Sequence, residues 1–138
     1  MAILALAGCA QQVPGRAMLD QSVGSLDEPL TSEPPDATRG LALVQGRDGN
    51  CLLCHAIPET GARFMGNLGP SLSGVGSRMS AGQLRLRLVD SLRLNPNSIM
   101  PSYFKTEGLN QVAETWRGKT ILSAQQIEDT IAYLLTLR

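Results

Sequence analysis

The chain has 138 residues, 12 basic and 12 acidic side chains, and a formal net charge of zero. A chain of this length is most often a single domain, with some allowance for tails. The balance of charge gives no support for nucleic-acid binding, and no stretch approaches the ~20 apolar residues of a membrane-spanning helix.

The charges are unevenly distributed along the chain. Residues 1–36 hold one basic and five acidic side chains, whereas residues 37–138 hold 11 basic and seven acidic ones. A mildly basic domain behind an acidic segment suits docking to an acidic protein partner. An ordinary solvated surface explains the same distribution equally well.

The first nine residues form a short apolar run that ends in small side chains, as the tail of a secretory signal peptide does. The run lacks a positively charged start. Its last four residues, Leu6-Ala7-Gly8-Cys9, resemble a bacterial lipobox, in which the cysteine is lipidated. Lipid anchoring at Cys9 and a plain signal remnant with a free Cys9 remain as alternatives.

Residues 10–35 show no helical or strand periodicity and contain four prolines, so we expect a linker or disordered tail. The domain is predicted to span residues 36–138, with residues 1–35 as signal or lipobox remnant and linker. Asp36 is a good N-cap for a helix over residues 37–45, which Gly46 would end. We expect Gly40, inside that helix, to permit the close approach of another helix, with an accident of sequence as the alternative.

The most informative motif is Cys51-Leu52-Leu53-Cys54-His55. Two cysteines three residues apart, followed at once by a histidine, are the pattern of covalent c-type haem attachment. On one helical turn, Cys51, Cys54 and His55 stand at i, i+3 and i+4 and share a face. We predict that the two thiols bond the haem vinyl groups and that His55 ligates the iron.

Two other chemistries use a pair of cysteines. A dithiol redox pair needs no histidine and favours a βαβ setting. A structural zinc site needs four ligands, but the chain offers only one histidine and one further cysteine, Cys9. Haem attachment is the prediction that uses every residue of the motif.

A glycine-rich loop follows at residues 66–78. It lacks the lysine and the strand–helix setting of a phosphate-binding loop. Pro70 has no N–H, but its carbonyl is free to accept a hydrogen bond from His55 Nδ1, which would orient the imidazole on the metal. A plain surface turn is the alternative.

Ser80 and Gln83 have the form of a capping box, and we predict a helix over residues 81–94. Its apolar stripe is expected to consist of Leu84, Leu88, Val89 and Leu92. Its arginines, at positions 85, 87 and 93, are expected on the outer, solvated side, with a partner or a haem propionate as the alternative.

A haem iron held by one histidine needs a second axial group for electron transfer, and thioether sulfur is a common one. The candidates are Met65, Met79 and Met100. Met65 lies ten residues after His55, and Met79 directly precedes a helix. Met100 lies in a loop bounded by two prolines, far enough along to close over the opposite haem face. We predict Met100 as the ligand, the alternative being a methionine that fills the core.

Residues 104–119 lack clear periodicity, with a short helical turn over residues 109–116 as one interpretation. Trp116 either donates to a haem propionate or packs. Ser123 and Gln126 form a second capping box. The helix that follows has an apolar stripe of Ile127, Ile131, Leu134 and Leu135. Its Tyr133 is expected to meet the first helix near Gly40.

These features together resemble a class I cytochrome c over residues 36–138. The resemblance is carried by the Cys51–His55 motif, the loop from Gly69 to Arg78, Met100-Pro101 and the final helix with Tyr133. It implies an all-α fold in which the N- and C-terminal helices cross beside one covalently bound haem c. Cys51 and Cys54 would form its thioethers, and His55 and Met100 would be its axial ligands.

More narrowly, the chain resembles the SoxX family, the monohaem subunits of the SoxAX thiosulfate-oxidising complex. The distinctive pieces are residues 106–110 and 116–119, Thr-Glu-Gly-Leu-Asn and Trp-Arg-Gly-Lys. The resemblance implies a SoxA-like cytochrome partner that holds the catalytic site and joins thiosulfate to a carrier-protein cysteine, as an L-cysteine S-thiosulfotransferase. This chain would be the non-catalytic subunit and would pass electrons to a further cytochrome.

Covalent haem attachment of this type indicates a periplasmic location. The lipobox-like residues Leu6–Cys9, which the family resemblance does not imply, would reach a membrane only through a lipid on Cys9. Two other functions fit the motifs. One is a stand-alone electron carrier of a respiratory chain, which needs no SoxA. The other is a haem-based sensor, which needs a labile or missing Met100 ligand.

Overall fold

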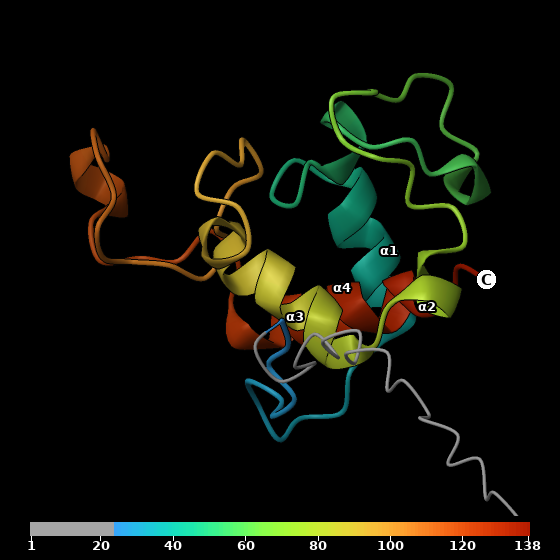
Figure 1. Cartoon of the computed structure of the whole chain (residues 1–138), viewed down its shortest axis with the longest axis horizontal. Helices are drawn as coiled ribbons and strands as arrows, with labels where there is room; N and C mark the ends of the chain where they lie inside the picture. The colour runs from blue at the N-terminus through green and yellow to red at the C-terminus, as the bar shows by residue number, and fades with distance from the viewer. Residues whose placement is uncertain (1–23) are drawn as a thin grey trace, which may run out of the picture.

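The computed structural model describes residues 24–138, and that part of the chain contains helices and turns but no strand (Figure 1). The four α-helices are α1 (Ala37–Gln45), α2 (Val75–Arg78), α3 (Ala81–Asp90) and α4 (Ala124–Leu134). Short 3₁₀ turns lie between them at Cys51–Leu53, Pro58–Thr60, Ser91–Arg93 and Glu114–Trp116. No described helix has both the length and the apolar character needed to cross a membrane.

Helices α1 and α4 cross in close contact at Gly40. A methyl group at Gly40 would overlap the backbone carbonyl of Asp129 and would lie 2.9 Å from the Tyr133 Cβ. Only glycine therefore allows the two backbones to approach this closely. The predicted roles of Gly40 and Tyr133 are confirmed.

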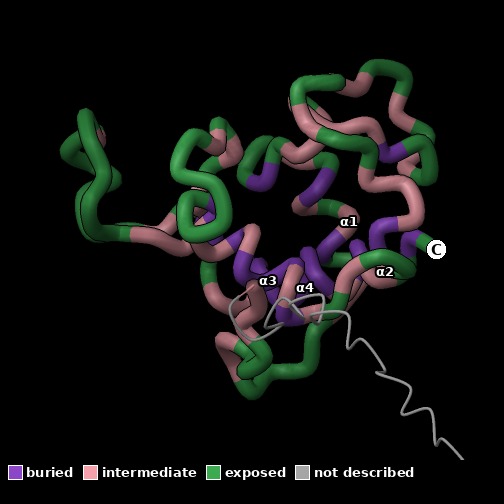
Figure 2. Tube along the Cα trace, in the orientation of Figure 1, coloured by how far each residue is buried: buried purple, intermediate pink, exposed green. Residues whose placement is uncertain are grey.

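The core is built on this crossing, and the buried residues gather along α1, α3 and α4 (Figure 2). Its apolar side chains are mostly aliphatic, so the packing is close and contains few aromatic rings. The buried members are Val44, Ile57, Val75, Leu84, Leu88, Tyr103, Leu122, Ile127, Ile131, Tyr133, Leu134 and Leu137.

The helix starts follow from their caps. Asp36 Oδ1 accepts hydrogen bonds from the Thr38 and Arg39 N–H groups at 2.7 and 3.0 Å. Both predicted capping boxes, at Ser80 and Ser123, are present. The predicted end of α3 was too late, because the backbone leaves helical geometry at Asp90 (φ −153°, ψ 87°) and continues as a 3₁₀ turn.

The expectation that Arg85 lies on a solvated side of its helix is wrong. Arg85 is only 3 % exposed, and its Nε and Nη2 donate to the two carboxylate oxygens of Glu128 at 2.7 and 2.8 Å. Its Nη1 donates to the carbonyls of Leu26 and Asp27. Arg85 is buried because the chain before α1 covers this side of α3.

That covering chain is residues 24–35, part of the predicted linker. As expected, it contains no helix or strand, but it is bonded to the helices that follow: Leu26 N–H donates to the Gly82 carbonyl at 3.0 Å and Leu30 N–H donates to Glu128 Oε1 at 3.0 Å. The domain boundary at Asp36 stays a prediction. The signal, lipobox and Cys9 predictions lie outside the described residues.

The buried Arg85–Glu128 pair makes a prediction about stability. Burial alone would raise the pKa of Glu128, but the hydrogen bonds from Arg85 and from Leu30 N–H outweigh it and leave that pKa below its usual 4.5. A carboxyl with a lowered folded-state pKa stabilises the fold above its unfolded pKa. This stabilisation is lost as the pH falls through the folded-state value.

We expect Arg85→Met to lower the free energy of unfolding of the haem-loaded protein by about 3–5 kcal/mol at pH 7, because it leaves a buried carboxylate unpaired. The difference from wild type should narrow below pH ~4.5, where Glu128 takes up a proton in the unfolded state. Denaturant titrations at several pH values measure this. Arg87→Met is the control, because the hydrogen bond that Arg87 donates in the described chain goes to the Gln83 carbonyl of its own helix. An equal loss of unfolding free energy in both variants would contradict the account.

Candidate haem site

The motif from Cys51 to His55 folds as one tight turn. Asn50 enters it in the left-handed region (φ 48°), and the N–H groups of Cys54 and His55 both donate to the Cys51 carbonyl, at 3.2 and 2.9 Å. The turn begins as 3₁₀ over Cys51–Leu53. Because the Cys51 carbonyl accepts the N–H groups of both Cys54 and His55, the two cysteines and the histidine are held together within five residues of chain.

The two cysteines are free thiols and are half-buried. Burial raises the pKa of the Cys51 thiol to about 11. A redox dithiol works through a thiolate with a lowered pKa, so this environment disfavours the dithiol alternative. Among the described residues, no three His, Cys, Asp or Glu side chains are placed to hold a metal ion between them.

The imidazole of His55 is oriented by the glycine-rich loop. Its Nδ1 lies 2.7 Å from the Pro70 carbonyl oxygen. A carbonyl can only accept, so Nδ1 carries the proton and Nε2 keeps a free lone pair for a metal. The ring packs against Gly69, where a methyl group would overlap it. The predicted Pro70 contact is therefore present.

The three candidate methionines lie in different environments. Met65 is already engaged on the attachment side, because its Sδ accepts the Ile57 N–H at 3.1 Å. Met79 and Met100 are partly buried against the core. The backbone of Met100 is held by Ser91 Oγ, which donates to its carbonyl at 2.6 Å, and by Ser98 Oγ, which accepts its N–H at 3.2 Å.

Three residues beyond Met100, Tyr103 connects this segment to the attachment turn. Its hydroxyl donates to the Gly49 carbonyl at 2.6 Å, and its ring is buried. The structure thus brings the Met100 segment next to Cys51. Tyr103 belongs to the Met100–Tyr103 segment that carries the SoxX resemblance, but its contact with Gly49 was not predicted. Ser91 was not singled out, because it lies in no periodic pattern or known motif.

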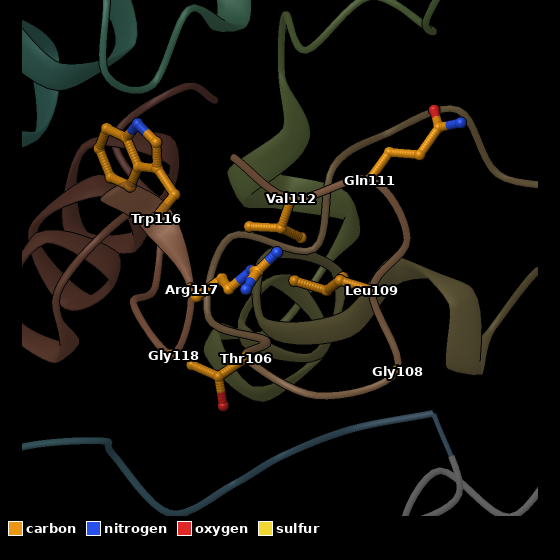
Figure 3. Close-up of a pocket in the computed structure, with 8 residues that line it drawn as sticks. All are labelled: Thr106, Gly108, Leu109, Gln111, Val112, Trp116, Arg117 and Gly118. Atoms are coloured by element: carbon orange, nitrogen blue, oxygen red, sulfur yellow. The ribbon is translucent and has the colours of Figure 1, made fainter. Parts of the chain in front are cut away.

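Trp116 lies elsewhere. It is 55 % exposed and belongs to a segment that projects from the body, where it borders an open cavity of about 350 Å³ (Figure 3). The residues lining that cavity include no histidine, cysteine or methionine. They are Thr106, Gly108, Leu109, Gln111, Val112, Trp116, Arg117 and Gly118.

Comparison with known proteins decides the family. The family model described as cytochrome c matches residues 37–138. The chain belongs to the cytochrome c family. It is also similar to a chain in the crystal structure of SoxXA from P. pantotrophus, with 31 % identity and a TM-score of 0.76, over 83 % of this chain and 90 % of that one. No curated protein sequence matches it.

This membership confirms the all-α class I cytochrome c fold and implies covalently bound haem c. The donor set fits that cofactor: two thiols on one turn, a histidine with Nε2 available, and a methionine in a neighbouring segment. When bound, such a haem stores and releases one electron. The assignments of Cys51, Cys54, His55 and Met100 as individual ligands stay predictions.

The choice among the methionines can be tested directly. Met100→Ala should abolish the far-red absorption band of methionine-ligated ferric haem and lower the reduction potential, because thioether ligation raises it. Met65→Ala is the matched control, since the Met65 sulfur is engaged by the Ile57 N–H. A Met100→Ala spectrum identical to wild type, or loss of the band in Met65→Ala, would rule Met100 out.

Proposed function

We propose that the chain is the electron-transfer haem subunit of a SoxAX-type complex. In this role it accepts electrons through its haem, one at a time, when a partner subunit joins thiosulfate to a carrier-protein cysteine. It then passes them to another cytochrome. The complex would be an L-cysteine S-thiosulfotransferase, and its catalytic site would lie in the SoxA-like partner.

The observation that carries this proposal is the similarity to a SoxXA chain, 90 % of which is covered by this one. The site favours the same role. With His55 and Met100 as the ligands supplied by this chain, a bound haem iron would have no position left for substrate and would serve electron transfer. We place it in the periplasm, where this type of haem attachment takes place, either anchored through a lipid on Cys9 or with Cys9 free.

A permanent partner is also favoured by residues 106–121, which we call the arm. The arm leaves the body beside Tyr103 and returns at Leu122, whose N–H donates to the Tyr103 carbonyl at 3.0 Å. It projects away from the helices and is drawn in orange and brown in Figure 1. Every residue from Thr106 to Lys119 is exposed except Val112, which is half-buried (Figure 2).

The arm is shaped by its own contacts. Trp116 N–H donates to the Ala113 carbonyl at 2.8 Å, and Arg117 pairs with Glu114 at 2.9 Å. The arm exposes the apolar side chains of Leu109, Trp116 and Ile121, which are 42, 55 and 44 % exposed. Leu109 and Trp116 line the cavity of Figure 3.

The chemistry of the arm suits a stable subunit better than a passing carrier. It has two acidic and two basic side chains, so it offers no net charge to steer a transient partner. Exposed aromatic and aliphatic anchors beside a cavity are typical of the centre of a lasting interface. We therefore propose that the arm of this chain binds the SoxA-like subunit.

Co-expression with the SoxA-like subunit of the same organism tests the proposal. The two chains should co-purify, and thiosulfate with a carrier protein bearing a free cysteine should reduce the haem of this chain. Trp116→Ala should weaken the complex by at least about 10-fold, as loss of an aromatic anchor does. Phe64→Ala is the control, because Phe64 is 84 % exposed on a different loop.

The outcomes separate the two claims. Failure of the wild-type chain to bind the SoxA-like subunit would overturn the SoxX-type role and leave a stand-alone carrier. A stable complex that Trp116→Ala and Phe64→Ala weaken equally, or not at all, would overturn only the assignment of the arm. The visible spectrum of each variant checks that the haem site is intact.

A further inference from the structure

We propose that Tyr103 is a positioning residue that holds the Met100 segment against the haem-attachment turn. Through the Gly49 carbonyl it would govern how firmly the methionine stays on the iron. This inference rests on Met100 being the axial ligand. It concerns the release of that ligand, which the donor set alone does not determine.

The first step is the contact itself. The Tyr103 hydroxyl donates to the Gly49 carbonyl oxygen at 2.6 Å, and the Cys51 Sγ lies 3.7 Å from the same oxygen. The hydrogen bond therefore ends directly beside a predicted thioether sulfur. Gly49 lies close to the end of α1, because a methyl group there would overlap the Leu43 carbonyl.

The second step is the state of the phenol. Tyr103 is only 7 % exposed, and burial raises the pKa of its hydroxyl far above the usual value of 10. The phenol consequently remains a hydrogen-bond donor throughout the physiological pH range. Its acceptor is a buried backbone carbonyl, which is costly to leave without a partner.

The third step is that the tyrosine itself is fixed. Its N–H donates to the Leu88 carbonyl of α3 at 2.8 Å, and its carbonyl accepts the Leu122 N–H just before α4 at 3.0 Å. The backbone of Tyr103 is thus held by the helical body on both sides. Its side chain extends from that body to the turn before Cys51.

The last step is that the other anchors of this segment lead elsewhere. Ser91 binds the Met100 carbonyl at 2.6 Å, and Asp90 accepts hydrogen bonds from Ser102 at 3.0 Å and Lys105 at 3.2 Å. These contacts tie the segment to the end of α3. Among the hydrogen bonds of residues 98–105 in the described chain, the Tyr103 hydroxyl is the link that reaches the attachment turn.

An axial methionine exchanges between bound and released states, and whatever holds its segment in place favours the bound state. Removing one hydrogen bond of this kind corresponds to about a 3- to 10-fold change in that equilibrium. An added ligand that competes for the iron reads the change directly.

The test is imidazole titration of the ferric haem protein. Imidazole binding is measured as the loss of the far-red methionine band. Tyr103→Phe keeps the ring and removes the hydroxyl, and it should bind imidazole about 3- to 10-fold more tightly than wild type. Tyr133→Phe is the matched control, since it removes the hydroxyl of another buried tyrosine at the α1–α4 crossing. It should bind imidazole as wild type does.

Thermal unfolding of both variants distinguishes positioning from general stability. Equal imidazole affinity in Tyr103→Phe and wild type would overturn the inference. A rise in the imidazole affinity of Tyr133→Phe in proportion to its loss of stability would overturn it as well. The premise fails separately: if Met100→Ala retains the far-red band, Met100 is not the ligand. The SoxA-binding experiment is independent of both results.

Discussion

The contact between α1 and α4 at Gly40 is the constraint on which the rest of the structure depends. Because Gly40 lies against the Asp129 backbone, the two helices form one rigid unit at opposite ends of the domain sequence. The C-terminal end of α1 then leads directly into the turn that carries Cys51. The helix crossing therefore sets where the haem-attachment motif begins, and the contacts from Pro70 and Tyr103 hold the turn itself.

The same crossing explains why α4 buries two neighbouring acidic side chains. Glu128 accepts hydrogen bonds from Arg85 and from the Leu30 N–H. Asp129 accepts hydrogen bonds from Arg39 at 2.6 Å and from the Asp36 N–H at 2.7 Å. Burial opposes these charges, but the hydrogen bonds outweigh it, and the pKa of each carboxyl is lowered. Helix α4 thus packs against α1 through its apolar residues and holds the chain before α1 through its acids.

Much of this architecture could be predicted from local sequence. Asp36, Ser80 and Ser123 identified the helix starts, because a cap is a property of three or four adjacent residues. The Cys51–His55 motif and the Pro70 contact followed from the chemistry of the residues. The helix contact at Gly40 was predicted because glycine destabilises a helix interior, and a close contact with another helix compensates for this loss of stability.

The rest depended on residues far apart in the chain. Arg85 was expected in solvent because it lies outside the predicted apolar stripe of its helix, and nothing local shows that residues 24–30 cover that side. The Tyr103–Gly49 bond joins positions 54 residues apart, and the arm follows no helical or strand period. The first two features arise from tertiary contact and the third from local turns, and periodicity reveals neither.

The central claim is that the protein holds a closed, six-coordinate haem c for electron transfer. Exposure of the dithionite-reduced wild-type protein to carbon monoxide tests this claim most directly, because carbon monoxide binds only where an iron position is open or easily vacated. The account predicts a visible spectrum that carbon monoxide leaves unchanged at neutral pH. Rapid, stoichiometric formation of a carbon monoxide complex would contradict it and would favour a ligand-binding sensor.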